Sequence, residues 1–114
     1  MARSLQQIIQ DAQAKQHDER LKNVQGSYRF DIEGVGSYRL EVDRGRVRVQ
    51  ESSEPADCVL ACEPDDFVRI IEGQQNMLTA YMQGRVRIEG DVALAKVFHG
   101  FLPSARAAAE EVHP

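Results

Sequence analysis

Apolar and polar residues alternate along several short stretches of this chain. Residues 28–32, 38–42, 46–50 and 85–89 place an aromatic or aliphatic side chain at every second position, with charged or polar residues between them. A period of two sends successive side chains to opposite faces of an extended strand. Residues 58–62 are almost continuously apolar, which predicts a mostly buried strand. The pattern therefore predicts five strands.

The connections between these strands predict how they pair. Glu33-Gly34-Val35-Gly36 and Asp43-Arg44-Gly45-Arg46 are short and contain glycine, which adopts the positive φ angles of tight hairpin turns without steric cost. The first three strands are therefore expected to form an antiparallel meander. Residues 51–56 are polar and include Pro55, so we expect a loop there that crosses the sheet.

A second period marks the helices. Apolar residues recur at positions 5, 8, 9 and 12, the spacing of one helix face, and Ser4 before them is a good N-cap. A helix is therefore expected from about Ser4 to Gln16. Further helices are predicted from Pro64 to Gly73, from Asn76 to Gly84 and from Asp91 to about His99, with Ser104 placed to cap an alanine-rich tail.

The composition is that of a globular protein. The chain has 114 residues, 42% hydrophobic and 28% charged, which suits one core, so we expect a single domain over residues 1–114. A net charge of −4 disfavours nucleic acid as a partner, because domains that bind phosphates carry a clustered positive excess. No stretch approaches the ~20 apolar residues of a membrane span.

The two cysteines indicate the redox environment. On one strand, Cys58 and Cys62 would lie about 13 Å apart at ~3.3 Å per residue. A disulfide needs Cα atoms within about 7 Å, so both thiols are expected to stay reduced. Reduced thiols, together with an N-terminus that lacks the apolar centre of a secretory signal, indicate a cytoplasmic location.

Ordered blocks of residues over about positions 21–102 form a recognisable pattern. They are Tyr28 to Ser37, Ala56 to Cys58, Asp66-Phe67, Gly73 to Gly84 with Leu78-Thr79-Ala80-Tyr81-Met82-Gln83, and Ile88 to Asp91. This pattern resembles the sterol carrier protein type 2 domain family. The resemblance implies an α+β fold, with a five-stranded, mostly antiparallel twisted sheet and helices packed on one face, enclosing an apolar cavity. It also implies that the chain carries an apolar lipid, such as a fatty acyl chain, a sterol-like molecule or an isoprenoid, and is not an enzyme.

The end of the chain departs from part of that family. Val112-His113-Pro114 is not the peroxisomal targeting tripeptide of eukaryotic members. Peroxisomal targeting is therefore not expected. The resemblance suggests a standalone member of the bacterial type, and the identity of the lipid stays open.

The second half of the chain carries more apolar surface than a sheet alone can cover. Residues 92–102 form a face wider than the ~100° stripe of a surface helix, and residues 77–82 add two flexible methionines. We expect part of these faces to fill the core and part to line the lipid cavity. The candidate lipid-binding residues are Phe67, Ile71, Met77, Leu78, Tyr81, Met82, Val86, Ile88, Leu94, Val97, Phe98, Phe101 and Leu102.

Two alternatives stay open. The same apolar helix face would also suit a protein-interaction or dimerisation module without a ligand, in which the partner is a second copy or an enzyme. Arginines at positions 44, 46, 48, 85 and 87 are expected to form a solvated outer face of the sheet with ion pairs across strands. Transient contact of this face with anionic lipid head groups is the second interpretation of the arginines.

Catalytic and metal-binding patterns are not found. The three histidines are far apart in sequence and lack the spacing of metal ligands. Asp65 and Asp66 are adjacent, so on a helix they point about 100° apart, and an acidic first turn has an electrostatic explanation. Cys58 has no histidine placed by sequence to activate it. We therefore expect no enzyme activity, no metal and no cofactor.

Overall fold

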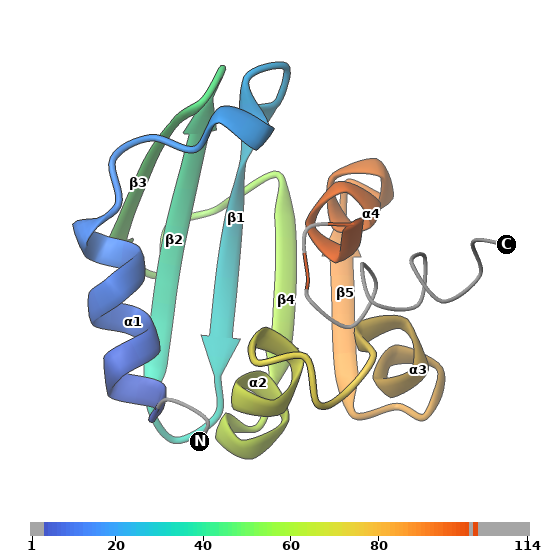
Figure 1. Cartoon of the computed structure of the whole chain (residues 1–114). Coiled ribbons are helices and arrows are strands. Elements are labelled where there is room, and N and C mark those ends of the chain that lie inside the picture. The colour runs from blue at the N-terminus through green and yellow to red at the C-terminus, as the bar shows by residue number, and fades with distance from the viewer. Residues whose placement is uncertain (1–3, 101, 103–114) are drawn as a thin grey trace, which may run out of the picture.

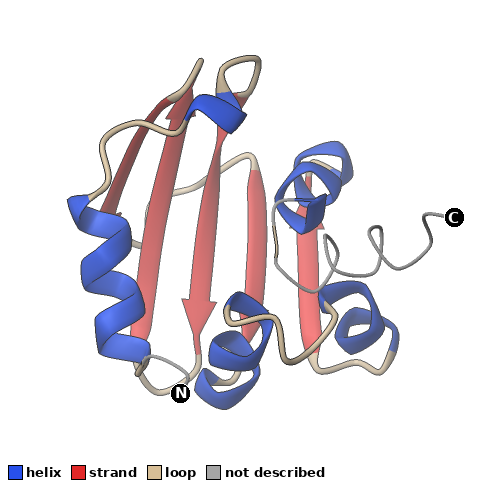
Figure 2. Cartoon of the chain, in the orientation of Figure 1, coloured by secondary structure: helices blue, strands red, loops and turns tan. Residues whose placement is uncertain are grey.

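The computed structural model describes residues 4–100 and 102, which fold into a sheet covered by helices on one face (Figures 1 and 2). Five strands of the described chain pair in the order β3-β2-β1-β4-β5. They are β1 (Gln25–Ile32), β2 (Gly36–Asp43), β3 (Arg46–Glu51), β4 (Cys58–Cys62) and β5 (Val86–Gly90). The predicted α+β class and the five strands are confirmed.

The helices begin where the sequence predicts. They are α1 (Leu5–Ala14), the short 3₁₀ helix η1 (Glu19–Leu21), α2 (Pro64–Ile71), α3 (Met77–Met82) and α4 (Val92–Gly100). Ser4 and Asn76 cap α1 and α3, because their side chains accept hydrogen bonds of 3.2 and 3.0 Å from the backbone N–H groups of Gln7 and Thr79. The predicted cap at Ser104 lies outside the described residues.

Helix α1 is shorter than predicted, since it ends at Ala14 instead of Gln16. The backbone is already extended at Lys15, and the Gln16 carbonyl accepts a hydrogen bond from the Val47 N–H at 3.1 Å. His17 then forms a single antiparallel bridge with Arg46. The segment after α1 thus pairs with the outer edge of β3 and occupies backbone groups that an open sheet edge leaves unpaired.

The turn between β2 and β3 has the geometry that tight hairpins prefer. Arg44 and Gly45 have φ angles of 49° and 96°, and two successive positive values match a type I′ turn. Strands β1, β2 and β3 therefore form the predicted antiparallel meander.

The loop after β3 crosses the sheet, so β4 lies parallel to β1, with Tyr28 opposite Cys58. Ser27 and Asp57 fix the start of this pair. The Ser27 N–H donates to Asp57 Oδ2 at 3.0 Å, and the Asp57 N–H donates to Ser27 Oγ at 2.9 Å. The remaining neighbours are antiparallel, which makes the sheet mostly antiparallel.

The outer face of the sheet is polar, but its ion pairs differ from the expectation. Arg29 pairs with Asp31 at 2.9 Å and Arg39 with Glu41 at 3.0 Å, so these bridges run along strands and not across them. Residues two apart on a strand share a face, and this allows the long arginine side chains to fold onto neighbours of the same strand. Among the arginines of the prediction, Arg85 pairs with Asp66 of α2, so the prediction of ion pairs across strands was wrong for Arg85.

The inner face packs against the helices. Its buried core is continuous, and it consists of Tyr28, Val42, Cys58, Leu60, Ile70, Met77, Ala80, Val86, Ala95 and Leu102. The sheet therefore has one dry and one wet face, as the alternating pattern predicts.

Candidate functional site

A cavity of about 520 Å³ lies between the inner face of the sheet and the helices. Its floor comes from alternate residues of the meander. Register places Tyr28 opposite Leu40 and Leu40 opposite Val49, so their side chains lie side by side on the same face. The full set on the floor is Tyr28, Phe30, Ile32, Tyr38, Leu40, Val42, Val47 and Val49. The floor is therefore almost entirely apolar.

The roof of the cavity comes from segments at both ends of the chain. Helix α1 contributes Ile8, Ile9 and Ala12, one face of the predicted amphipathic helix. Helix α2 contributes Phe67 and Ile71, and the C-terminal side contributes Phe98 and Leu102. The N-terminal helix is thus as much a part of the site as the later helices.

Four aromatic rings, from β1, α2 and α4, contact one another at the end of the cavity next to α4. The Phe30 ring lies 5.2 Å from the ring of Phe98 and 5.8 Å from that of Phe67, and Tyr28 lies 5.7 Å from Phe98, measured between centroids. Tilted and edge-to-face contacts at these distances are favourable. The Tyr28 hydroxyl donates to the Leu94 carbonyl at 2.7 Å, and burial raises the pKa of Tyr28 to about 12.

The cavity does not continue beyond these rings, because α4 sits directly on the sheet. A Cβ atom placed on Gly26 would lie 2.8 Å from a methyl carbon of Leu94, closer than real side chains approach. Glycine at this position therefore lets α4 approach β1 and leaves no open space between them.

Charged side chains mark the polar edge of the cavity, formed by Asp11, Lys15, Asp18 and Arg20. Arg20 donates to both carboxylate oxygens of Asp18, at 3.0 and 2.7 Å, and Lys15 Nζ lies 3.0 Å from Asp18 Oδ2. The hydrogen bonds from Arg20 are the largest cause that holds the pKa of Asp18 well below its ordinary value. The Lys15 and Arg20 side chains are about half exposed, so the cavity reaches the surface here.

Part of the predicted lipid-binding set lies at the cavity. Phe67, Ile71, Phe98 and Leu102 line it. Met77 and Val86 are buried in the core away from it, and Ile88 and Leu94 pack against that core. Leu78, Tyr81 and Met82 are exposed, and Val97 is partly buried without lining the cavity. Phe101 lies outside the described residues.

Sequence reasoning missed the residues of α1 and of the meander that form most of the lining. Both signals were present, because α1 has an apolar stripe and each strand has an apolar face. They indicated buried faces but did not distinguish a face that contacts protein from one that borders an open space.

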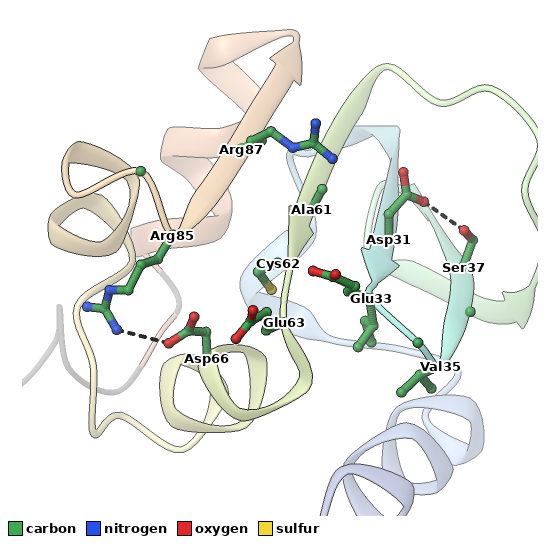
Figure 3. A pocket seen from close by; sticks show the side chains of 14 residues that line it. Asp31, Glu33, Val35, Ser37, Ala61, Cys62, Glu63, Asp66, Arg85 and Arg87 are labelled. Carbon is green, nitrogen blue, oxygen red and sulfur yellow. Dashed lines mark hydrogen bonds and ion pairs between the residues drawn. The ribbon is translucent and has the colours of Figure 1, made fainter.

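A second depression, of about 800 Å³, lies at one end of the outer face, and Figure 3 shows it to be polar. Three of its charged side chains, Asp31, Asp66 and Arg85, bind other side chains of the protein. Asp31 accepts from Ser37 at 2.8 Å and from Arg29, and Asp66 accepts from Arg85 at 2.9 Å (Figure 3). Such a lining does not suit a hydrocarbon, so the inner cavity is the candidate lipid site.

The two thiols are free, as predicted, and they are poor nucleophiles. Burial raises the pKa of Cys58 and raises that of Cys62 to about 11, so both stay protonated at neutral pH. Within residues 4–100 and 102, no three histidine, cysteine or acidic side chains are grouped to hold a metal ion. None of the helices in that part of the chain has the length and apolarity to span a bilayer.

Known proteins share this architecture. Residues 5–103 match the model of the SCP-2 sterol transfer family. Hydroxysteroid dehydrogenase-like protein 2 of Xenopus laevis is 32% identical over 98 residues, a match that covers 82% of this chain and 24% of the Xenopus protein. The chain thus spans about a quarter of the length of the curated relative that it matches.

Solved structures agree with the fold. Sterol carrier protein domain 2 of Helicoverpa armigera superposes with a TM-score of 0.67 at 22% identity, over 95% of this chain and 90% of that one. Sterol carrier protein 2 of Aedes aegypti, solved in complex with palmitate, gives a TM-score of 0.68 at 20% identity, over 91% and 98% of the two chains. Since the family model extends from α1 past the end of α4, this chain belongs to the SCP-2 sterol transfer family.

Proposed function

We propose that this chain is a lipid carrier that binds the hydrocarbon part of one lipid between the sheet and helices α1, α2 and α4. The observation that carries the proposal is the apolar cavity of about 520 Å³, which reaches the surface among charged side chains. Sites for small molecules are typically about 300–1,000 Å³ and mostly apolar. Each methylene removed from water contributes about 0.8 kcal/mol before ordering costs, so a long chain binds with few polar contacts.

A fatty acyl chain is the first ligand class that we propose. The Aedes aegypti protein of the same fold holds palmitate, and the family description adds sterols. The chain of the lipid would lie over Phe30 and Leu40, with its head group at the polar edge. Lys15 there has three ammonium N–H donors and one contact with Asp18, so it can also donate to a carboxylate or phosphate.

The lipid contacts that we propose from the helices are Phe67, Ile71, Phe98 and Leu102, joined by Ile8 and Ile9 of α1. Direct contact of the lipid with the other candidate residues stays a prediction. We propose that residues 1–114 act as one carrier domain without catalysis or a cofactor, in the cytoplasm. Transient contact with a membrane, or with an enzyme that consumes the lipid, would load and unload it.

Native mass spectrometry of gently purified protein tests this function. A fraction of the protein is expected to carry an extra mass that organic extraction removes, and the extracted protein is expected to bind a fluorescent fatty acid that palmitate displaces. Repeated absence of the extra mass, together with no uptake of the fluorescent fatty acid, would contradict the proposal.

A protein-interaction or dimerisation module is the second candidate. Leu78, Tyr81 and Met82 on α3 favour it, because they are 38%, 47% and 83% exposed. Light scattering of the native protein and of Met82→Asp distinguishes the two. A dimer that Met82→Asp dissociates would support a module, whereas a monomer in which this substitution leaves fatty-acid uptake unchanged would contradict it.

A further inference from the structure

Asp66 is an acidic residue buried near the start of α2, with 4% of its surface exposed. Its Oδ1 atom accepts two charged hydrogen bonds, from Arg69 Nη2 at 2.8 Å and from Arg85 Nη1 at 2.9 Å. Arg69 lies on the same helix, three residues later, whereas Arg85 lies immediately before β5. The two arginines therefore differ in what they connect, although they bind the same oxygen.

Arg85 links α2 to the loop between α2 and α3 and to α3 itself, and Figure 3 shows its contact with Asp66. Besides Asp66, its guanidinium donates to Gln75 Oε1 at 2.8 Å, in the loop between α2 and α3. It also donates to Gln83 Oε1 at 2.6 and 3.0 Å, at the end of α3. The Arg85 N–H donates to the Ala80 carbonyl at 2.9 Å, which holds the backbone of Arg85 against α3. Arg85 thus provides a fixed point against which α2 is held.

One side of α2 faces the core and the cavity, and Asp66 lies on another side. Ile70 is buried in the core, while Phe67 and Ile71 line the lipid cavity. Asp66 and Phe67 are adjacent, so on a helix their side chains point about 100° apart. The ion pair with Arg85 therefore restrains the same turn of α2 that presents Phe67 to the cavity and to the ring of Phe30.

We infer that the Asp66–Arg85 ion pair positions α2 as a wall of the cavity and limits how fast a lipid enters and leaves. This inference rests on the proposed carrier function. A lipid buried between the sheet and the helices exchanges only when one of the covering helices moves. Helix α2 is one of these, because its Phe67 and Ile71 side chains line the cavity. A buried, charge-assisted pair depends strongly on geometry, so α2 shifts only when the pair breaks.

Two matched substitutions test the inference. Arg85→Gln removes the link between α2 and β5, while Arg69→Gln removes the link within α2. Each variant loses one positive charge and one hydrogen bond to the same Asp66 oxygen, and the two arginine side chains are comparably exposed, at 35% and 45%. The measurements are stopped-flow association and dissociation of a fluorescent fatty acid, its equilibrium affinity, and thermal unfolding.

Arg85→Gln is expected to raise both the association and the dissociation rate constants by about tenfold, which corresponds to a barrier lowered by about 1.4 kcal/mol. The affinity should change much less, because both directions cross the same barrier. Arg69→Gln should stay within about twofold of the native rates. Equal rate changes in the two variants, or unchanged rates in Arg85→Gln, would overturn the inference.

Two further measurements keep the test decisive. If Arg85→Gln does not fold, Asp66→Asn removes the negative charge of the pair and keeps the shape of the side chain, so it should also exchange lipid faster than the native protein. Native rates in Asp66→Asn would then count against the inference. Hydrogen exchange of the amides of residues 67–72 needs no lipid. Faster exchange in the Arg85 variant than in Arg69→Gln supports positioning of α2 even if the carrier function itself fails.

Discussion

The two halves of the inner face differ in how closely the helices approach the sheet. Over β4, β5 and the first residues of β1, Ala80 and Ala95 are almost completely buried, and Gly26 of β1 admits Leu94 of α4, so small residues let the helices sit close. Over the rest of β1 and over β2 and β3, α1 and α2 present large side chains such as Ile9 and Phe67 toward the sheet. The half over β4 and β5 is filled, whereas the half over β2 and β3 holds the cavity. The size of the helix residues that face the sheet therefore determines where the cavity forms.

Truncation of one leucine in each half should give the largest difference in stability between the two halves. Leu60 is buried in the filled half, and Leu40 lies on the cavity floor. Leu60→Ala should lower the free energy of unfolding by about 2–5 kcal/mol, because it opens a new void. Leu40→Ala should lower it by only about 1–2 kcal/mol, since one side of Leu40 already borders open space. Urea denaturation measures both, and equal losses would mean that the cavity is not open in solution.

A charge placed on either face of β3 tests the polarity of the cavity. Val49 lines the cavity and its neighbour Gln50 is on the exposed face. Val49→Asp should weaken fatty-acid binding at least ~30-fold, about 2 kcal/mol, because a bound alkyl chain would remove water from the carboxylate. Gln50→Asp adds the same charge on the outer face and should leave the affinity within about twofold. Fluorescent displacement titrations measure both, and similar losses in the two variants would place the ligand elsewhere.

Removal of the Tyr28 hydroxyl tests the boundary between the two halves. Tyr28→Phe loses the hydrogen bond to the Leu94 carbonyl and should lower stability by about 1 kcal/mol at pH 7. The pKa of Tyr28 is raised in the folded protein, so its contribution is fully present below pH ~10, the unfolded value. It is lost as the pH rises toward 12. Denaturation at several pH values should therefore show the advantage of the native protein over Tyr28→Phe shrinking above pH 10.

Phe98→Ala should produce the smallest change, an altered preference for chain length. The ring of Phe98 lines the cavity beneath α4, and its removal extends the cavity by the volume of the ring. Each further methylene that enters should gain about 0.8 kcal/mol, or about fourfold in affinity. Competition between fatty acids of increasing length measures this preference. An unchanged order of affinities would mean that Phe98 does not limit the length of the cavity.

The elements of the fold were predictable because their signals are local. Ser4 and Asn76 cap helices through bonds that span three residues, and the turn at Arg44-Gly45 depends on two adjacent φ angles. Alternation along β1, β2, β3 and β5 likewise identified the inner face. Such signals need only neighbouring residues, so the sequence contains them in full.

The lining of the cavity was less predictable because it depends on distances between elements. Met77 and Phe67 are both apolar residues of helices with a buried side, yet only Phe67 reaches the cavity. Asp66 was explained by the helix start alone, but it is buried against Arg85, 19 residues later. Neither the gap between a helix and the sheet nor a contact at that separation follows from periodicity.

The parallel pairing of β1 with β4 has a consequence for the order of assembly. The hairpins that join β1, β2 and β3 close short loops, whereas the β1–β4 pair joins residues about 30 positions apart. Closing the longer loop costs more chain entropy, so the meander is expected to form before β4 docks. Helix α2 follows β4 directly, and its side chains therefore reach the floor only after that docking. During folding, the part of the apolar floor that α2 covers is therefore expected to stay exposed until β4 docks, and a lipid bound there at that stage would become enclosed.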